Sequence, residues 1–246
     1  MTCQIVIPAR LASTRLPEKL LRRVGGKSVL RHTYDAACRS ELASAVVVAV
    51  DDVRLADEVR SFGGQAVMTP TACPSGTDRV AYVARHTPGT DLFVNVQGDE
   101  PEIDPRTIDA VIAKLRSDGE ADVATAVTPI RDPVLADDPH CVKVVADASG
   151  RAIYFSRAAI PFIRDRGPDD PPRLHHLGLY AYRREFLMWF ASQPPSPLEL
   201  AEKLEQLRAV EAGRRVVVAH VASATPGIDT EEDLRAFRRR VEPGGR

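Results

Sequence analysis

The chain has 246 residues, of which 44% are hydrophobic and 27% are charged, which excludes a disordered or collagen-like protein and allows a folded core. Its 33 lysine and arginine residues nearly balance 34 aspartate and glutamate residues. The chain therefore lacks the basic surplus of proteins that bind polymeric nucleic acid.

The cellular compartment is indicated by the N-terminus and the cysteines. Residues 1–10 are a short apolar run that ends in arginine, without the features of a secretory signal, and no apolar run is long enough to span a bilayer. The four cysteines have no metal-binding spacing, which favours buried free thiols: Cys3, Cys38, Cys73 and Cys141. We expect a cytoplasmic protein without a membrane partner.

The first half of the chain alternates two patterns. Apolar runs predict strands at Ile5–Ile7, Ala45–Val50 and Leu92–Val96. Helical periodicity predicts helices at Val29–Cys38, Val53–Phe62 and Thr77–Arg85. This alternation predicts βαβ units and an α/β fold with a mostly parallel sheet.

Strand-like runs dominate from Ala121 onward and predict an added mixed-sheet region: Val123–Val127, Val142–Val145 and Leu177–Tyr182. The stretch 165–173, rich in proline, aspartate and arginine, is typical of a surface loop. We predict one α/β unit with a substrate-binding elaboration.

Two later helices have clear start signals. Ser196 to Glu199 form a capping box with proline at the first helical position, and Thr230 precedes three acids. Helical spacing after the first start predicts that three leucines face the core: Leu200, Leu204 and Leu207.

The loop after the first strand concentrates groups that bind phosphate. It lies where α/β sheets bind ligands, beyond the carboxyl end of a strand. Guanidinium and ammonium groups suit a triphosphate, although a solvated basic loop is the alternative reading. The candidates are Arg10, Ser13, Thr14, Arg15 and Lys19.

A second basic segment, Gly25 to Ser28, resembles a P-loop only superficially. That motif needs a glycine five residues before Gly26, where Leu21 stands. We interpret these residues as a turn followed by a helix start.

Asp99 ends a predicted strand at the carboxyl edge of the sheet. Magnesium prefers one or two carboxylates together with phosphate oxygens, so Asp99 is a metal candidate, with a turn-forming acid as the alternative. Asp229 could complete the site, although an ordinary helix-start acid is the better explanation of Asp229 taken alone.

Other polar residues carry weaker signals. His175 and His176 are neighbours on a predicted strand, so only one can easily enter a pocket, and a lone histidine is usually structural. Three acids on the later helix are more typical of solvated surface than of ligands: Glu199, Glu202 and Glu205.

Taken together and in order, these segments resemble the CMP-Kdo synthetase (3-deoxy-manno-octulosonate cytidylyltransferase) family from Ile5 to about Leu234. The matching pieces are IPARLASTRLPEKLL at 7–21, SGTDR at 75–79, NVQGDEP at 95–101, VKVV at 142–145, YFSRAAIP at 154–161, HLGLYAYR at 176–183, SPLELAEKLEQLR at 196–208 and GIDTEEDL at 227–234.

The resemblance implies a nucleotidyltransferase (Rossmann-like) α/β fold as a single domain over 1–246, with 1–120 mainly for CTP and 121–246 mainly for the sugar and dimerisation. CTP would be bound by Arg10, Ser13, Arg15, Lys19, Ser75, Gly76, Thr77 and Arg79. The sugar would be bound by Gln97, Arg157, His176, Tyr180, Glu205 and Gln206.

The resemblance also implies a reaction. The anomeric hydroxyl of Kdo would attack the α-phosphorus of CTP, giving CMP-Kdo and pyrophosphate for lipopolysaccharide synthesis in a homodimeric enzyme. Lys19, Asp99 and Asp229 would be catalytic, and the two aspartates would hold Mg²⁺.

Some alternatives stay open at this point. The chain departs from the family pattern at 138–141 and at His175, where an arginine is usual. The acceptor could be 8-amino-Kdo or a phosphonate acid, and a nucleotide-binding regulator without turnover is a reading of another class.

Overall fold

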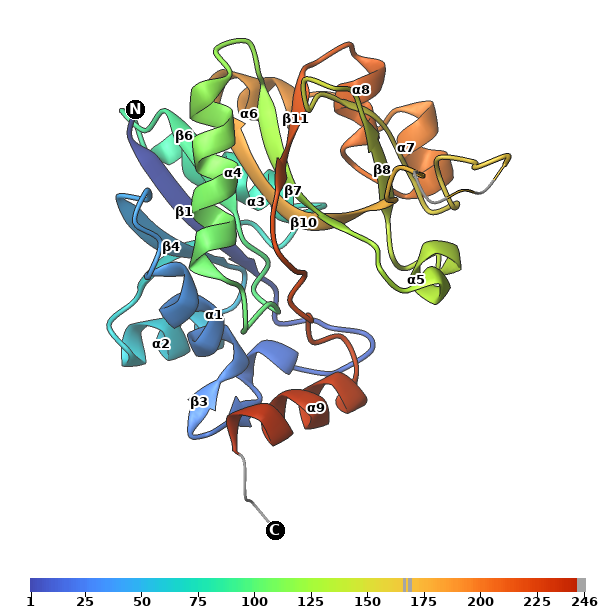
Figure 1. The fold of residues 1–246 in the computed structure, drawn as a ribbon. Coiled ribbons are helices and arrows are strands. Elements are labelled where there is room, and N and C mark those ends of the chain that lie inside the picture. Colours follow the sequence, from blue (N-terminus) through green and yellow to red (C-terminus); the bar gives the residue numbers. More distant parts are fainter. Residues whose placement is uncertain (166, 168–169, 243–246) are drawn as a thin grey trace. The chain divides into compact units, whose positions relative to one another are not determined.

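Strand β1 (Cys3–Ala9) is buried along its whole length, as expected of a strand covered on both faces. It lies between β4 (Ala45–Val50) and β6 (Leu92–Asn95), and both pair with it in parallel. β5 (Gln65–Met68) continues the parallel sheet beyond β4. The predicted α/β fold with a mostly parallel sheet is confirmed (Figure 1).

The computed structural model describes residues 1–165, 167 and 170–242. These form two compact units, the first made of Met1–Asp109 with Thr225–Arg246 and the second of Ala110–Ala224. Within the predicted loop over 165–173, residues 166, 168 and 169 lie outside the described residues. Among the described helices, none is both long and apolar enough to cross a membrane.

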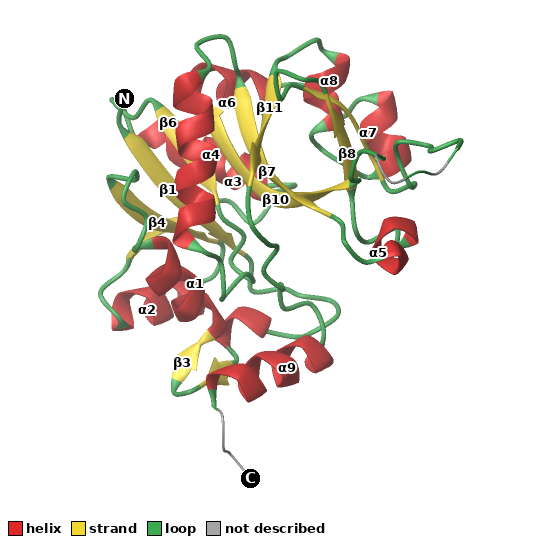
Figure 2. Ribbon diagram, viewed as in Figure 1, coloured by secondary structure: helices red, strands yellow, loops and turns green. Residues whose placement is uncertain are grey.

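Helices α1 (Val29–Ala37) and α3 (Gly76–His86) contact β1 and β4 in the first unit, and α2 (Val53–Ser61) contacts β4 and β5 (Figure 2). Each begins at a residue whose side chain accepts a hydrogen bond from the first turn: Ser28, Asp52 and Ser75. The three predicted helices are therefore confirmed within one residue at each end.

The segment from the phosphate loop to α1 forms a small hairpin. After the 3-10 helix η1 (Lys19–Leu21), strands β2 (Arg23–Val24) and β3 (Lys27–Ser28) pair across Gly25 and Gly26. Both glycines have positive φ, 57° and 78°, as such a tight turn requires. The predicted turn and helix start are confirmed.

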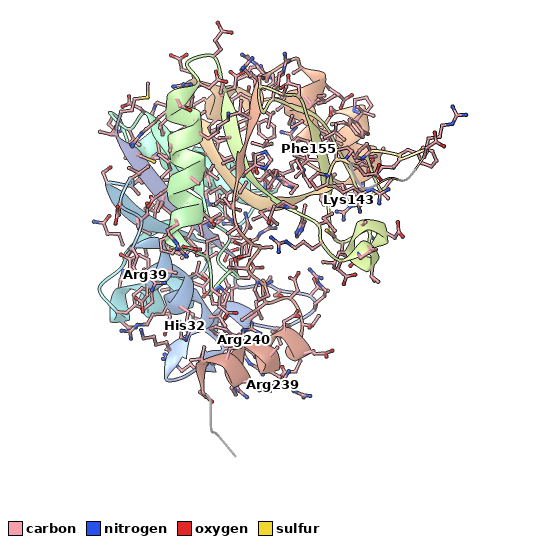
Figure 3. The ribbon with its side chains drawn as sticks, in the orientation of Figure 1. His32, Arg39, Lys143, Phe155, Arg239 and Arg240 are labelled. Atoms are coloured by element: carbon pink, nitrogen blue, oxygen red, sulfur yellow. The ribbon has the colours of Figure 1, made fainter. Side chains whose placement is uncertain are left out.

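Helix α9 (Glu231–Val241) belongs to the first unit. Thr230 caps it in a box with Asp233, which confirms the predicted start. His32 of α1 packs edge-on against Phe237 of α9 with ring centroids 5.1 Å apart (Figure 3). An ion pair from Arg240 to Glu102 ties the far end of α9 to the same unit.

The second unit contains the predicted mixed sheet. β7 (Val123–Pro129) pairs in parallel with β11 (Val216–His220) and antiparallel with β10 (Leu174–Arg183). β8 (Lys143–Ala146) pairs antiparallel with β10 and with β9 (Ala152–Ser156). The remaining helices of the chain are α4 (Pro105–Ser117), α5 (Pro133–Asp137), α6 (Arg184–Phe190), α7 (Pro197–Glu202) and α8 (Leu207–Glu211).

The predicted helix after Ser196 is two helices. The capping box is confirmed, but α7 ends at Lys203, which adopts the left-handed conformation with φ 55°. Because the break resets the helical register, Leu204 and Leu207 are buried while Leu200 remains 53% exposed. The prediction that Leu200 faces the core is wrong.

Glu199 is another correction, because it is buried instead of solvated. Its carboxylate accepts from Arg208 Nη2 at 2.6 Å and from Nε at 2.7 Å, and from the Ser196 N–H at 3.1 Å. Burial alone acts to raise the pKa of Glu199, but these hydrogen bonds outweigh it and hold the pKa below its ordinary value of 4.5.

This ion pair makes stability depend on pH. Because the folded-state pKa of Glu199 is depressed, its stabilisation is present above pH 4.5 and is lost as the pH falls through the folded-state value. Glu199→Gln should lower the free energy of unfolding by about 2–4 kcal/mol at pH 7. Denaturant unfolding of the wild type and of Glu199→Gln at pH 7 and pH 3 checks this. A difference in the free energy of unfolding that is the same at both pH values would contradict it.

Candidate active site

The first unit contains a cavity of about 260 Å³ at the carboxyl ends of β1 and β6. This is the edge at which α/β sheets bind ligands. Eight of the predicted site residues line it: Arg10, Ser13, Arg15, Lys19, Gly76, Gln97, Asp99 and Asp229. The fold therefore brings together most of the predicted CTP and metal residues.

The predicted phosphate loop is fixed in position by its buried leucines and by the close packing of Pro8 against Gly98. Leu16 and Leu20 are buried, so the polar residues between and before them stay at the surface of the cavity. A Cβ on Gly98 would lie 3.1 Å from the Pro8 carbonyl oxygen, so only glycine fits this approach without displacing the loop. The loop and the end of β6 thus share one wall.

Lys19 connects the two predicted metal ligands. Its Nζ donates to Asp99 Oδ2 at 2.5 Å, to Asp229 Oδ1 at 3.0 Å and to the Ile228 carbonyl at 2.9 Å. Arg15 Nη2 also lies 2.9 Å from Asp229 Oδ1. Two carboxylates that are far apart in the sequence therefore face one ammonium group.

The surroundings keep Lys19 charged. Burial acts to lower the pKa of Lys19, but the charges and hydrogen bonds of Asp99 and Asp229 outweigh it and raise the pKa above 10.5. The cavity thus combines three basic side chains from the loop with two carboxylates at its edge. The chemistry of this set suits a polyanion together with a divalent cation.

The other predicted CTP residues take different positions. Ser75 caps α3 and donates its hydroxyl proton to Asp78 Oδ2 at 2.7 Å. Thr77 is buried, and the Arg79 side chain is 0% exposed. The cytidine contacts of these three residues stay predictions, and none of the three lines the cavity.

Two polar residues with clear structural roles were not singled out as site residues. Asp51, at the end of β4, accepts from the Leu11 N–H and from the Arg79 guanidinium. Lys143 is fully buried, and its Nζ donates to the carbonyls of Asp138 at 2.9 Å and Arg157 at 2.5 Å (Figure 3). The sequence carries a signal for both residues: Asp51 directly follows an apolar run, and Lys143 interrupts one.

The predicted sugar residues, apart from Gln97, all lie in the second unit. His176 is buried, with Nε2 3.0 Å from Thr125 Oγ1 and its ring edge-on to Phe155. Burial, together with the charge of the neighbouring His175, lowers the pKa of His176 to about 3, so the imidazole is neutral at physiological pH. Of the two histidines, His176 is buried and hydrogen-bonded, and the prediction that only one of them enters a pocket stays a prediction.

Tyr180 is a neighbour of this histidine, and Glu205 lies close enough to Tyr180 for its charge to act on the phenol. The Tyr180 ring centroid lies 5.4 Å from that of His176. Burial, together with the charges of Tyr182 and Glu205, raises the pKa of Tyr180 well above its ordinary value, so its hydroxyl keeps its proton. Gln206 is buried, and among the described residues its Nε2 has no hydrogen-bond partner.

Arg157 is held by the backbone. Nε donates to the Glu202 carbonyl at 2.8 Å, Nη1 to the Pro139 carbonyl at 2.8 Å and Nη2 to the Lys203 carbonyl at 3.4 Å. The Glu202 carboxylate also accepts from the Arg157 N–H at 3.0 Å. The role of Arg157 in sugar binding stays a prediction.

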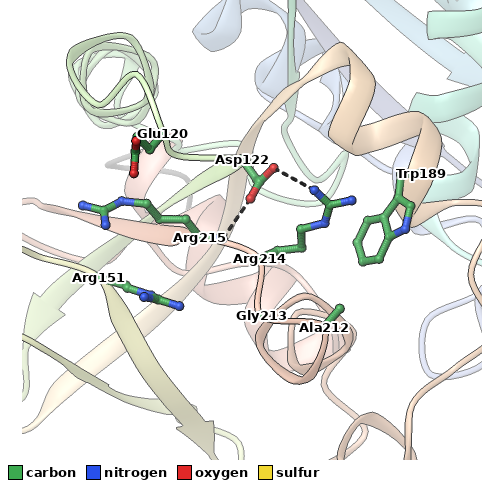
Figure 4. Close-up of a pocket in the computed structure, with 8 residues that line it drawn as sticks. All are labelled: Glu120, Asp122, Arg151, Trp189, Ala212, Gly213, Arg214 and Arg215. Carbon is green, nitrogen blue, oxygen red and sulfur yellow. Dashed lines mark hydrogen bonds and ion pairs between the residues drawn. The ribbon is translucent and has the colours of Figure 1, made fainter.

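A second cavity, of about 540 Å³, lies in the second unit and contains none of the predicted site residues (Figure 4). Its arginines are largely neutralised. Arg214 lies 3.6 Å from Asp122 and 4.2 Å from the centre of the Trp189 ring, while Arg215 lies 2.9 Å from Asp118. The wall also contains Glu120 and Arg151, so that, with Asp118 included, three acids balance three arginines.

Comparison with known proteins decides the family. The model of the cytidylyltransferase family matches residues 4–216. A 3-deoxy-manno-octulosonate cytidylyltransferase from Rhodopirellula baltica is 59% identical over 248 residues, covering 98% of this chain and 99% of the relative. The chain belongs to the 3-deoxy-manno-octulosonate cytidylyltransferase family.

Other members of this family agree. The 3-deoxy-manno-octulosonate cytidylyltransferase of Geobacter sulfurreducens is 47% identical over 243 residues, covering 95% of this chain and 97% of the relative. The solved structure of a CMP:2-keto-3-deoxy-manno-octonic acid synthetase complexed with CTP matches with a TM-score of 0.92 and 40% identity, covering 98% of each chain. The family predicted from the ordered motifs is confirmed.

Proposed function

We propose that this enzyme transfers CMP from CTP to the anomeric hydroxyl of 3-deoxy-D-manno-octulosonate, releasing pyrophosphate and supplying CMP-Kdo for lipopolysaccharide synthesis. The observation that carries the proposal is 59% identity over nearly the whole chain to an enzyme named for this reaction. The cavity with three basic side chains and two carboxylates supports the nucleotide half.

The triphosphate of CTP fits the basic side of the cavity. Arg10 and Arg15 supply planar guanidinium donors, Lys19 a point charge and Ser13 a hydroxyl. These groups would hold the triphosphate and withdraw charge from the leaving pyrophosphate. We assign the cytidine to the neighbouring wall that Gly76 forms.

Asp99 and Asp229 are the proposed Mg²⁺ ligands. Within the described residues no group of three or more histidine, cysteine or acidic side chains could hold a metal. At this edge of the sheet the protein offers two carboxylates. That donor set fits Mg²⁺, which prefers one or two carboxylates and takes its other ligands from phosphate and water. When bound, Mg²⁺ would neutralise phosphate charge and lower the pKa of a coordinated hydroxyl.

The sugar half rests on the second unit. The Thr125 hydroxyl donates to the Leu179 carbonyl at 2.8 Å, so the 3.0 Å contact with His176 requires Nε2 to carry the imidazole proton. Among the described contacts, Nδ1 of the neutral ring has no hydrogen-bond partner and could accept from a sugar hydroxyl. The Gln206 amide nitrogen, buried and unpartnered among the described residues, is a donor that a sugar could satisfy.

The reaction is a substitution at phosphorus. The anomeric oxygen of Kdo forms a bond to the α-phosphorus of CTP, the bond from that phosphorus to the bridging oxygen breaks, and pyrophosphate leaves. The hydroxyl proton passes to solvent. Positioning and charge neutralisation by the loop cations would supply most of the acceleration.

An acceptor panel tests the proposal. Pyrophosphate release from CTP and Mg²⁺ is measured with Kdo, 8-amino-Kdo, sialic acid and small phosphonates. Release with Kdo supports the assignment, whereas release only with another acceptor reassigns the substrate and keeps the nucleotide site. CTP binding without release for any acceptor would support a regulator.

We also propose a cytoplasmic homodimer. The four cysteines are free thiols, which suits a reducing compartment. The second unit exposes several apolar side chains, among them Phe162 at 86% and Ile153 at 55%. Large exposed apolar groups of this kind often mark protein interfaces.

Charge at this apolar surface should break the dimer. Ile153→Asp combined with Phe162→Asp should shift the sedimentation mass from that of a dimer to that of a monomer, because burying charge at an interface is costly. Val53→Asp is the matched control, since Val53 is 60% exposed in the first unit. A wild-type protein that sediments as a monomer would contradict the dimer.

A further inference from the structure

Asp51 links the phosphate loop to the sheet. It directly follows β4, and its Oδ1 accepts from the Leu11 N–H at 3.0 Å. Leu11 is the residue after Arg10, at the start of the loop that lines the nucleotide cavity. The second oxygen, Oδ2, accepts from Arg79 Nη2 at 2.9 Å. The carboxylate therefore spans from loop to helix α3.

Arg79 is a rigid anchor for this carboxylate. Its side chain is 0% exposed, and Nη1 donates to Thr69 Oγ1 at 2.6 Å and to the Pro70 carbonyl at 3.3 Å. Thr69 in turn donates from both its hydroxyl and its N–H to the carbonyl of Val50, the last residue of β4. The guanidinium is thus fixed to the end of β4, next to Asp51.

Such a buried ion pair is a costly way to stabilise a fold. Desolvation of the two charges offsets most of their attraction, so apolar residues would stabilise the site as well. What apolar residues could not do is fix a position. The two oxygens of the Asp51 carboxylate hold the Leu11 N–H at a set place relative to the Arg79 guanidinium. Catalytic groups must be held to within about 0.5 Å, which requires such fixation of the loop that carries them.

The same helix also shapes the cavity wall. Gly76 begins α3 and lines the cavity, and a Cβ there would lie 3.3 Å from Pro8 Cγ. One segment therefore supplies the wall at Gly76 and the anchor at Arg79. A shift of α3 or of the end of β4 would therefore displace the loop, because Asp51 is bonded to both.

We infer that Asp51 is a positioning residue for CTP: held by Arg79, it fixes the Leu11 N–H and with it the loop that binds the triphosphate. It touches no substrate itself. The inference rests on the proposed role of the cavity in CTP binding, and it assigns the 75–79 segment a role in aligning that loop.

Calorimetric titration of CTP into Asp51→Ala tests this. The dissociation constant should rise about 10-fold, the equivalent of one lost charge-assisted hydrogen bond, while the KM for Kdo stays within about 2-fold. Asp51→Asn keeps a carbonyl oxygen that can accept from Leu11, so it should recover much of the CTP affinity although it also loses the ionic pairing.

Glu199→Gln is the control for a merely structural role. It breaks a similarly buried carboxylate–arginine pair in the second unit and should lower the melting temperature without changing CTP affinity. If Asp51→Ala lowers the melting temperature as Glu199→Gln does but binds CTP as the wild type does, the inference is wrong.

Arg79→Lys is a second variant in case Asp51→Ala does not fold. Lysine keeps the charge but cannot reach Asp51, Thr69 and Pro70 together, so CTP affinity should fall by an intermediate factor. Unchanged affinity in this folded variant would overturn the inference. A wild type that binds CTP but releases no pyrophosphate overturns the proposed function, and the affinity series still decides the role of Asp51.

Discussion

Asp99→Asn should lower the kcat for pyrophosphate release by about 10²–10³-fold, because it removes the charge on one of the two carboxylates proposed to hold Mg²⁺. Asp229→Asn should have an effect of similar size. Since both carboxylates are proposed to hold the same cation, the double variant should be little worse than either single variant. Steady-state release at saturating CTP and Kdo, across a Mg²⁺ titration, measures the effect.

Asp57→Asn is the matched control, because Asp57 is an exposed acid on α2 that pairs only with Arg60 in the described contacts. It should leave kcat unchanged. Melting temperatures separate loss of function from loss of fold. Wild-type turnover and wild-type Mg²⁺ dependence in either aspartate variant would remove that residue from the metal role.

Lys19→Met should weaken the use of CTP by about 10²–10³-fold in kcat/KM while changing the KM for Kdo little, since it removes an ammonium group from the triphosphate side of the cavity. The same change should have an opposite effect on metal binding. The ammonium lies 2.5 Å from a carboxylate oxygen of Asp99 and 3.0 Å from one of Asp229, the oxygens that a cation would use. Its removal should tighten Mn²⁺ binding about 10-fold.

Electron paramagnetic resonance of Mn²⁺ in the absence of CTP measures this second effect independently of turnover. Lys27→Met is the control, because Lys27 pairs with Asp35 at 2.7 Å outside the cavity and should change neither quantity. A loss confined to the KM for Kdo would contradict the placement of Lys19. Mn²⁺ binding that is unchanged in Lys19→Met would show that the ammonium does not compete with the cation.

Local patterns predicted the first unit well. The runs and periodicities of β1, β4 and β6 and of α1 to α3 lie within short stretches of chain, so each can be recognised on its own. Asp99 could be placed at the carboxyl edge because a parallel sheet fixes which end of each strand meets the ligand. The family can be recognised because many such segments occur in the family's order, whereas no single motif is specific enough.

The predictions for Leu200 and Glu199 were wrong because features outside the helix itself override the local helical pattern. The leucine period after Ser196 predicted one helix, but Lys203 adopts a left-handed conformation and turns Leu200 outward. Glu199 looks like a surface acid in sequence, and only the approach of Arg208 explains its burial. Neither the break nor the partner has a signature within the helix itself.

The α/β class, a basic loop beyond β1, the position of Asp99 after β6 and the family are all predictable from local sequence patterns and their order. Tertiary structure alone decided that Asp229 meets Lys19, that Asp51 holds the Leu11 N–H, and that Arg79 is buried behind it. The reason is physical: periodicity and capping depend on neighbours a few residues away, whereas these contacts join segments that become neighbours only when the sheet has formed.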